Sequence, residues 1–352
     1  MKTHYIIPIF VPHKGCPHDC VFCNQKHITG QINEIDNVFV TRQIEDYLKT
    51  IKRVDSFIEV SFYGGSFTGL PVDVQLDLLK PAKNALDSGK IDAIRLSTRP
   101  DYIDNNILNI LKQYGVSIIE LGVQSMDNEV LALSNRGHTK EDVYKSAELI
   151  KENGFTLGLQ MMVGLPGDCE KKDLYAADEF IKIMPDMVRI YPALVIKDTY
   201  MEQMYHKGQY KPLTVDTAVN ICSKLYLKFE SKGIKIIRIG LQPTENMTPG
   251  KDIVVGPYHP ALRELVESCI INEIILYLYN IYKGKKLKIS VNPACISKLY
   301  ADKKKYFNKL LHEIPECNIK IIQDNNIAIN NVLFTNEEIS QIMSIKDYSL
   351  II

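Results

Sequence analysis

The sequence contains no tryptophan and no excess charge of either sign. Its 42 Lys and Arg residues balance 42 Asp and Glu residues, so the formal net charge is zero. A chain without net charge has no global field that draws it to nucleic acid or to an anionic membrane, so any nucleic-acid site must be a local patch. The sequence also lacks an uncharged apolar run of membrane-spanning length, and no membrane partner is expected.

Cysteine is present but not in the pattern of a disulfide framework. Five of the eight cysteines are scattered through the chain: Cys169, Cys222, Cys269, Cys295 and Cys317. An apolar segment begins almost at the first residue, so no signal peptide is expected. These features favour a reducing, cytoplasmic setting. With 352 residues, 45% of them hydrophobic, the chain can bury one large core or two smaller ones.

Strand-like and helix-like segments alternate over the first two thirds of the chain. Short apolar runs predict strands at 5–11, 57–62, 93–97, 117–123, 155–163, 187–191 and 234–241. Helical spacing of apolar residues predicts helices at 38–51, 71–85, 104–114, 140–153, 171–184 and 215–231, with Asp104 as an N-cap. This alternation predicts parallel βα units, in a number short of a complete eight-stranded barrel.

The remaining segment departs from this alternation. Residues 248–268 predict a connection with a short helix, followed by helices at 270–282 and 297–312. Strands are expected at 287–291, and at 319–322 and 326–330 as a hairpin. The fold class expected is therefore α/β: a partial (βα)6-type, TIM-like barrel over residues 1–245 with a small α+β extension over 246–352.

Three cysteines, Cys16, Cys20 and Cys23, occupy a short loop directly after the first predicted strand. Thiolates hold iron–sulfur clusters, usually four per cluster, so a set of three indicates a distant fourth ligand or an open iron. The residues leave other possibilities open. Zinc could use the three thiolates with His13, His18 or His27, and a cytosolic cysteine cluster can also be redox-active or incidental.

Polar and glycine-rich residues follow the other predicted strands. Gly64–Gly65 come after the second strand, and further groups end the third, fourth and fifth strands. The carboxyl ends of parallel strands meet at one rim, where α/β folds place their ligands. The cysteine loop and these groups are therefore expected to share one site.

The cysteine loop, with Phe22 before its last cysteine, resembles the signature of the radical S-adenosylmethionine (SAM) superfamily. The resemblance implies that Cys16, Cys20 and Cys23 hold a [4Fe–4S] cluster whose fourth iron binds the amino and carboxylate groups of SAM. Reduction would then break a carbon–sulfur bond and give a 5′-deoxyadenosyl radical. A reductant such as ferredoxin or flavodoxin is implied as a partner.

A wider set of motifs resembles the Elongator catalytic subunit-like branch of that superfamily. In order, they are YGGSFTGLP, STRPDYID, ELGVQSMDNEVL, NRGHT, GLPG, PDMVRIYPALVI and KGQYKPL, between Tyr63 and Leu213. GVQS and GLPG also resemble oxygen-independent coproporphyrinogen oxidases. One position departs from the superfamily pattern, because Ser66 stands where an acidic residue often follows the two glycines.

The resemblance implies cofactor contacts residue by residue, although it assigns no catalytic residue. Gly64 and Gly65 would bind the methionyl amino group, and Ser97 and Arg99 would face the SAM carboxylate or ribose. The remaining contacts implied are Gln124 and Ser125 near SAM, and Gln160 with Gly164 to Gly167 on the adenine side.

Three more residues have both a functional and a structural interpretation. Arg136 and His138 would lie near the rim, and Tyr191 could contact cofactor or substrate. Arg136 could equally cap a helix, and Tyr191 could be packing at the top of the barrel. A fourth residue, Glu120, could simply pair with a buried arginine inside the sheet.

The chain is expected to lack the acetyltransferase domain and the N-terminal RNA-binding extension of the Elongator catalytic subunit. The function expected is radical generation on tRNA or another RNA. A small metabolite or porphyrin-like substrate, a non-catalytic metal-binding module and an RNA-binding adaptor are the alternatives. Lysines interleaved with tyrosines between Tyr282 and Lys309 suit single-stranded RNA, and they also suit a solvated face.

Overall fold

The computed structural model describes residues 3–11, 20–24, 35–52, 54–241 and 248–352. These residues form two compact units. The first contains residues 1–212 with 243–256, and the second contains 213–242 with 257–352. The domain boundary expected at residue 245 stays a prediction, and each unit is described by itself.

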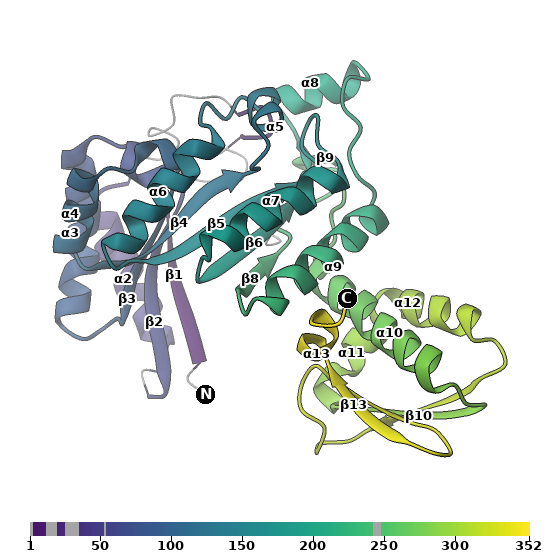
Figure 1. The fold of residues 1–352 in the computed structure, drawn as a ribbon. Helices are drawn as coiled ribbons and strands as arrows, with labels where there is room; N and C mark the ends of the chain where they lie inside the picture. Colours follow the sequence, from purple (N-terminus) through teal and green to yellow (C-terminus); the bar gives the residue numbers. More distant parts are fainter. Residues whose placement is uncertain (1–2, 12–19, 25–34, 53, 242–247) are drawn as a thin grey trace. The chain divides into compact units, whose positions relative to one another are not determined.

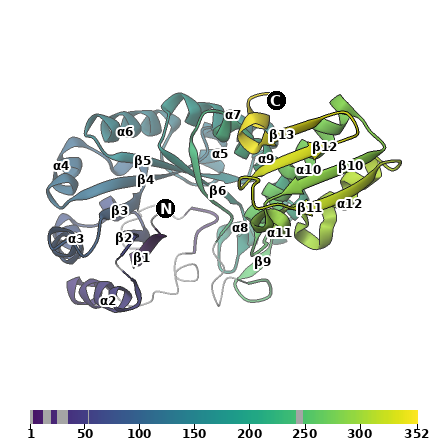
Figure 2. The same ribbon diagram turned by 90° about the horizontal axis from the view of Figure 1, so that it is seen from below.

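The first unit is built on a parallel sheet with strand order β1-β2-β3-β4-β5-β6. The strands are β1 (Thr3–Val11), β2 (Ser56–Gly64), β3 (Ala93–Thr98), β4 (Val116–Gln124), β5 (Thr156–Val163) and β6 (Met187–Pro192). Because consecutive strands are neighbours and parallel, each connection crosses one face of the sheet. Figure 2 shows these strands as an arc with the helices on its outer side. The expected partial barrel of βα units is confirmed.

Helices of the first unit follow the strands in turn (Figure 1). They are α2 (Asn37–Thr50), α3 (Val72–Asp87), α4 (Asn105–Gln113), α5 (Asn128–Leu133), α6 (Lys140–Glu152), α7 (Glu170–Ile183) and α8 (Tyr200–His206). Asp104 caps α4 as expected, because its carboxylate accepts a 2.8 Å hydrogen bond from the amide of Ile107. The sequence missed the short helices α5 and α8 and the two-stranded pair β7 (Val195–Ile196) and β9 (Ile253–Val255).

Alternation along the strands separates the two faces of the sheet. In β4, Ile119, Leu121 and Val123 are fully or almost fully buried and form part of the apolar core. The residues between them, Glu120 and Gly122, point to the opposite, concave face. Charged and polar side chains therefore lie on the concave face of the sheet, while helices cover the other face.

The second unit is an α+β structure. Its elements are α9 (Val215–Ser231), β8 (Lys235–Ile239), α10 (Leu262–Tyr282), β10 (Lys286–Val291), α11 (Ile296–Leu299), α12 (Ala301–Glu313), β11 (Asn318–Gln323), β12 (Asn331–Thr335), β13 (Ser340–Ser344) and α13 (Ile345–Ser349). The last four strands form a sheet of order β11-β10-β12-β13. Figure 1 shows α10 and α12 on one side of this sheet.

Two expectations for this unit are wrong. Residues 319–322 and 326–330 do not form a hairpin, because β10 lies between β11 and β12 and pairs with both. Residues 324–330 form a turn, in which Asp324 accepts a hydrogen bond from the amide of Asn326 and Asn330 has a φ of 66°. The alternating apolar residues Ile327 and Ile329 imitate a strand there.

The second wrong expectation concerns α10, which is one helix over Leu262–Tyr282 with no break near residue 269. By length and composition α10 could cross a membrane, and 56% of its most apolar window is buried inside the protein. Its side chains pack mainly against α9, α12 and α11. A long apolar helix of this kind is typical of the core of a folded unit.

Candidate functional site

The described end of the cysteine loop, Cys20 to Asn24, is held to other segments of the first unit by three hydrogen bonds and one apolar contact. The amide of Val21 donates to the carbonyl of Ser134 at the end of α5, and the carbonyl of Val21 accepts from the amide of Met201 in α8, at 3.2 and 2.7 Å. The Val21 side chain joins an apolar cluster with Val130, Leu165, Val195, Met201 and Tyr210. The amide side chain of Asn24 donates to the carbonyl of Lys197. The short helices α5 and α8 thus fix the position of this loop.

Two of the three predicted cluster ligands lie in this segment, while Cys16 lies outside the described residues. Cys20 is buried, Cys23 is partly exposed, and neither forms a disulfide. The amide of Cys23 donates to the carbonyl of Cys20 at 3.0 Å, so a tight turn brings the two residues together. Both residues are therefore thiols, the form of cysteine that a metal cluster requires.

A buried arginine contacts the first of these thiols. Nη1 of Arg136 lies 3.3 Å from Sγ of Cys20, and Nη2 donates to the carbonyl of Gly122 in β4. Arg136 is only 5% exposed, and its Nε atom has no hydrogen-bond partner among the described residues. The sequence placed Arg136 near the rim or at a helix cap, and the structure places it beside the cysteine loop.

The glycine pair lies beside the carboxyl end of β1. Gly64 pairs with Val11, the last residue of β1, and the amide of Gly65 donates to the carbonyl of Val11 at 3.1 Å. Neighbouring strands are about 4.8 Å apart, so the glycines are adjacent to the last residue of β1. Gly64 has a φ of 103°, a conformation that a residue with a Cβ rarely adopts. The structure thus places the glycine pair beside the end of β1, the strand that precedes the cysteine motif in the sequence.

The end of β4 is irregular in a way that is typical of functional sites. The pairing of β4 with β5 shifts between Gly122 and Gln124, and Gln124 has a φ of 75° although it is not glycine. This conformation turns the Gln124 side chain toward β5, where its Oε1 accepts from Nε2 of Gln160 at 3.1 Å. Gln124 and Gln160 were both predicted cofactor contacts, and the structure places them side by side.

The other predicted contacts end neighbouring strands. Ser97 lies in β3 and is partly exposed, and Ser125 follows β4, where its hydroxyl accepts from the amide of Asp127. Gly164 follows β5, and its carbonyl accepts from the hydroxyl of Tyr210 at 2.7 Å. All three lie at the carboxyl ends of adjacent parallel strands, on the rim that the sequence predicts. Their contacts with a cofactor stay predictions.

Arg99 has protein partners that the sequence did not indicate. Its Nε and Nη2 atoms donate to both carboxylate oxygens of Asp101 at 2.9 Å, and Nη2 also donates to the carbonyl of Arg136. Burial would raise the pKa of Asp101, but the hydrogen bonds and charge of Arg99 outweigh it and lower this pKa. The geometry makes Arg99 a support for the segment that carries Arg136.

His138 lies in the same segment and is neutral. Burial, and next the positive charges of Arg136 and Arg99, lower its pKa to about 3. Its Nε2 atom lies 3.2 Å from the carbonyl of Val123, so Nε2 carries the proton and Nδ1 is an acceptor. A neutral imidazole adds no positive charge to a site that already contains two buried guanidinium groups.

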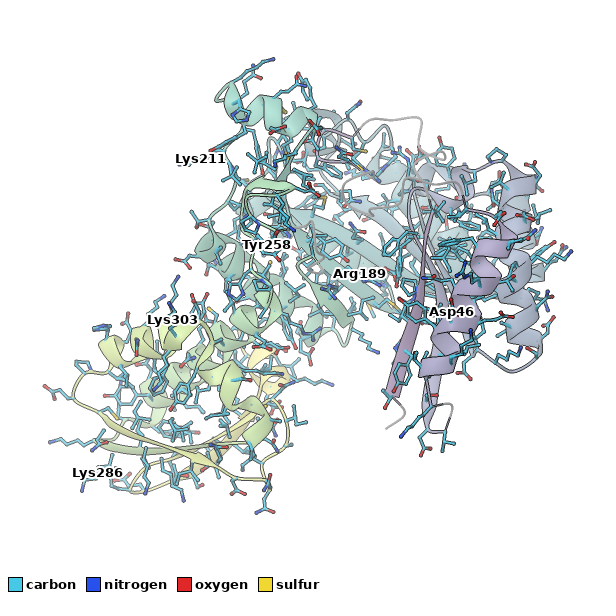
Figure 3. All side chains as sticks on the ribbon, turned by 180° about the vertical axis from the view of Figure 1, so that it is seen from behind. Asp46, Arg189, Lys211, Tyr258, Lys286 and Lys303 are labelled. Carbon is cyan, nitrogen blue, oxygen red and sulfur yellow. The ribbon has the colours of Figure 1, made fainter. Side chains whose placement is uncertain are left out.

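Four buried or partly buried charges occupy the concave face of the sheet below this rim. Nη1 of Arg95 lies 2.5 Å from Glu120, and Nη2 lies 2.9 Å from Glu59. Nε of Arg189 lies 2.5 Å from Glu120, and its Nη2 donates to the hydroxyl of Tyr63. Figure 3 labels Arg189 on the sheet. The interpretation of Glu120 as the partner of a buried arginine is confirmed, with two arginines rather than one.

The sequence missed the other three charges of this group. The available signal was a charged residue in the middle of a strand that is otherwise apolar, as in FIEVSF and AIRLS. The charges of the two glutamates and the two arginines cancel, and buried charges need such compensation. The strands also make room for them, because a Cβ at Gly158 would lie 2.8 Å from Cγ of Glu120.

A second missed feature lies behind GLPG. Asp168 follows this motif and Asp173 lies in α7, where burial, and next the charge of Asp168, raise the pKa of Asp173 to about 10. At neutral pH Asp173 is therefore protonated, and one proton holds the two carboxyl groups together. This pair connects α7 to the GLPG segment, and only the tertiary structure reveals it.

The sequence pattern of the Radical SAM superfamily matches residues 10–178, and that of the Radical SAM C-terminal domain matches residues 185–271. The first match includes the cysteine loop, the glycine pair and the strand ends described above. The chain belongs to the radical SAM superfamily. It is thus a member of an enzyme family that uses a [4Fe–4S] cluster and SAM.

Curated relatives of this radical SAM protein include longer proteins. The tRNA uridine(34) acetyltransferase of Methanocaldococcus jannaschii is 28% identical over 302 residues, which cover 74% of this chain and 54% of the relative. Elongator complex protein 3 of Dictyostelium discoideum is 30% identical over 258 residues, covering 61% of this chain and 46% of the relative. The chain thus spans about half the length of the curated relatives that it matches.

A solved structure supports the fold. The archaeal Methanocaldococcus infernus Elp3, with an N-terminal deletion, superimposes with a TM-score of 0.61 at 24% sequence identity. The match covers 80% of this chain and 68% of that chain. At this identity the likeness shows the shared fold, in agreement with the curved parallel sheet of the first unit.

The described residues fit the cofactors of the superfamily. Cys20 and Cys23 supply thiols as ligands, and the guanidinium of Arg136 beside Cys20 suits the negative charge of a thiolate. The backbone at Gly64–Gly65 and the amide side chains of Gln124 and Gln160 offer donors and acceptors for a polar ligand. Thiols and polar groups thus converge on one rim, as a cluster with bound SAM requires.

Proposed function

We propose that this radical SAM protein modifies tRNA or another RNA through a 5′-deoxyadenosyl radical. The observation that carries the proposal is the assembly of the cysteine loop, the glycine pair and the ends of β4 and β5 at one rim. Cys16, Cys20 and Cys23 would hold the cluster, which when bound would supply the reductive cleavage of SAM to methionine and a 5′-deoxyadenosyl radical able to abstract a hydrogen atom from the substrate. A low-potential reductant such as ferredoxin or flavodoxin supplies the electron for this cleavage.

The protein residues position the cofactors and exclude water. Val21 and its apolar neighbours pack the described end of the cysteine loop against α5 and α8, which limits the access of water to that segment. Gln124, held by its hydrogen bond to Gln160, is rigid at the end of β4. A rim whose side chains are already held in place lowers the cost of orienting the substrate beside the radical.

The proposal of RNA as the substrate is supported by similarity to proteins that are named for an activity on tRNA. Two of them are archaeal tRNA uridine(34) acetyltransferases, each 28% identical to this chain. Because this chain matches about half of their length, the proposal takes over only the radical reaction and the RNA substrate. Transfer of an acetyl group is not part of it.

The test is an anaerobic assay of 5′-deoxyadenosine. Protein reconstituted with iron and sulfide is mixed with SAM and dithionite, with and without bulk tRNA that lacks wobble modifications. We expect 5′-deoxyadenosine to form, and its rate to rise severalfold when tRNA is present, because bound substrate orders the site. Protein that holds a [4Fe–4S] cluster but forms no product under either condition would contradict the proposed function.

A further inference from the structure

We propose that the open face of the sheet in the second unit binds the phosphate backbone of RNA. This inference rests on the proposed function, because it names the part of the protein that holds the RNA substrate. The face is formed by β10, β11, β12 and β13 on the side away from α10 and α12, and it is called the lysine face below.

The charged side chains on these four strands are all positive, and they all lie on the same side of the sheet. Their only charged residues are Lys286 and Lys288 in β10 and Lys320 in β11, and all three are exposed. The residues between them, Leu287 and Ile289, are buried against the helices. Because side chains alternate along a strand, the lysines therefore lie on the open side.

Two of these lysines are direct neighbours. Lys288 and Lys320 are paired residues on adjacent parallel strands. Like charges on paired residues destabilise a sheet, and none of the three lysines has an ion-pair partner among the described residues. A polyanion that lies across the face would remove this repulsion and release its own counterions.

Lysines on the helices behave differently. Lys298 pairs with Glu267 at 2.9 Å, and Lys305 pairs with Asp216, so these charges are already compensated. Figure 3 shows Lys303 on the helix side of the unit and Lys286 on the sheet side. The lysine-rich segment of the sequence is thus divided between two sides of the unit. On the sheet side, Lys286, Lys288 and Lys320 form a compact group of positive charge without an ion-pair partner among the described residues.

Polar and apolar residues complete the lysine face. Thr335 and Ser340 continue the row of Lys288 across β12 and β13, and their hydroxyls can contact phosphate or ribose. The next row contains Ser290, which is buried, followed by Leu333 and Ile342, and Ile342 is 47% exposed. A charged row beside an apolar row suits a nucleic-acid strand, which has a charged backbone and flat apolar bases.

The test compares two double variants of equal charge. Lys288→Gln with Lys320→Gln changes the lysine face, and Lys303→Gln with Lys309→Gln changes exposed lysines of α12. Binding of fluorescent bulk tRNA to the reconstituted protein is measured by anisotropy between 50 and 300 mM salt. We expect the first variant to bind severalfold more weakly and to lose about 1.4 from the slope of log K against log salt, at about 0.7 for each phosphate contact.

We expect the α12 variant to bind like the unchanged protein. Equal affinities and slopes for the two variants, or no tRNA binding by the unchanged protein, would overturn the inference. Formation of 5′-deoxyadenosine without tRNA is measured in the same preparations, and both variants should keep it. Loss of this activity in every preparation would instead count against the proposed function, so the two failures can be told apart.

A second inference comes independently from the cysteine loop: the geometry points to Arg136 as a positioning residue that sets the reduction potential of the cluster. Its guanidinium is buried 3.3 Å from Sγ of Cys20, and it is held by the carbonyl of Gly122. Arg99 in turn donates to the carbonyl of Arg136. Hydrogen bonds to the cysteine sulfurs and nearby positive charge stabilise the reduced, more negative form of an iron–sulfur cluster.

Two variants test this role through the potential rather than through activity. Arg136→Gln removes the charge and Arg136→Lys keeps it. Iron content and the potential of the cluster, followed by electron paramagnetic resonance during a redox titration, are measured for both. We expect a more negative potential for Arg136→Gln and a value close to the unchanged protein for Arg136→Lys.

Equal potentials in all three proteins would overturn this second inference. If Arg136→Gln takes up no iron, the Lys variant decides. Normal iron content in Arg136→Lys would show that the positive charge beside Cys20 is what the site needs. Absence of iron in both variants would show that the arginine only maintains the local fold.

Discussion

Replacing Cys20 with alanine is expected to abolish cluster incorporation and, with it, SAM cleavage. Only three cysteines lie in the loop that resembles the superfamily signature, so each one removed leaves at most two local thiolates for the cluster. Cys20 also lies 3.3 Å from Nη1 of Arg136, and its position is fixed through the backbone of Val21. The measurement is iron and sulfide content with the absorbance of the reconstituted protein.

Cys169→Ala is the matched control for this variant. Cys169 is exposed, forms no disulfide and precedes α7, away from the cysteine loop in the sequence. We expect this control to keep its full iron content and its rate of 5′-deoxyadenosine formation. Full iron content in Cys20→Ala would remove Cys20 from the set of ligands and return the loop to the zinc or redox alternatives.

The sequence predicted the first unit well because local and tertiary signals agree there. The strands from β2 to β5 are apolar runs, such as IIELGV and LGLQMMV, and each precedes a helix that covers the sheet. The order of motifs along the chain also fixed which strand ends would meet. Because consecutive strands are neighbours and parallel, the strand ends that carry these motifs lie side by side. The order of the motifs is therefore enough to predict a shared site.

Several features of the site could not be read from the chain. No local pattern shows that Arg136 reaches Cys20, a contact between residues 116 positions apart. Arg99 was expected to face the cofactor, yet the structure shows it paired with Asp101. Such partners depend on side-chain directions in the folded unit, which spacing alone does not determine.

The second unit was harder to predict because its local signals mislead. The turn at residues 324–330 has strand-like alternation, while the pairing of β10 with both β11 and β12 joins segments that are distant in sequence. The lysine-rich segment appeared as one patch in the sequence. Strand alternation and the ion pairs of Lys298 and Lys305 divide it in the structure.

Replacing Glu120 with glutamine is expected to destabilise the first unit by about 3–5 kcal/mol. Glu120 is 3% exposed and is paired with Arg95 and Arg189. Glutamine has nearly the same shape but no charge, so the variant would leave one buried positive charge without compensation. The free energy of unfolding from urea denaturation measures this effect.

Glu129→Gln is the control, since it makes the same chemical change at an exposed ion pair. Glu129 lies 2.6 Å from Lys172, and its side chain is 71% exposed. Exposed pairs contribute about 0–1 kcal/mol, so the control should lose little stability. Similar losses in both variants would show that the buried group on the concave face contributes no more than a surface ion pair.

The pH dependence of stability separates the charge of Glu120 from its shape. Burial would raise the pKa of Glu120, but the charges and hydrogen bonds of Arg189 and Arg95 outweigh burial and lower it. A carboxyl with a lowered pKa stabilises the fold above its unfolded pKa, near 4.5, and this contribution is lost as the pH falls further. The unchanged protein should therefore lose stability below about pH 4.5 more steeply than Glu120→Gln. Parallel curves for the two proteins would mean that the loss in the variant comes from packing, because glutamine cannot titrate.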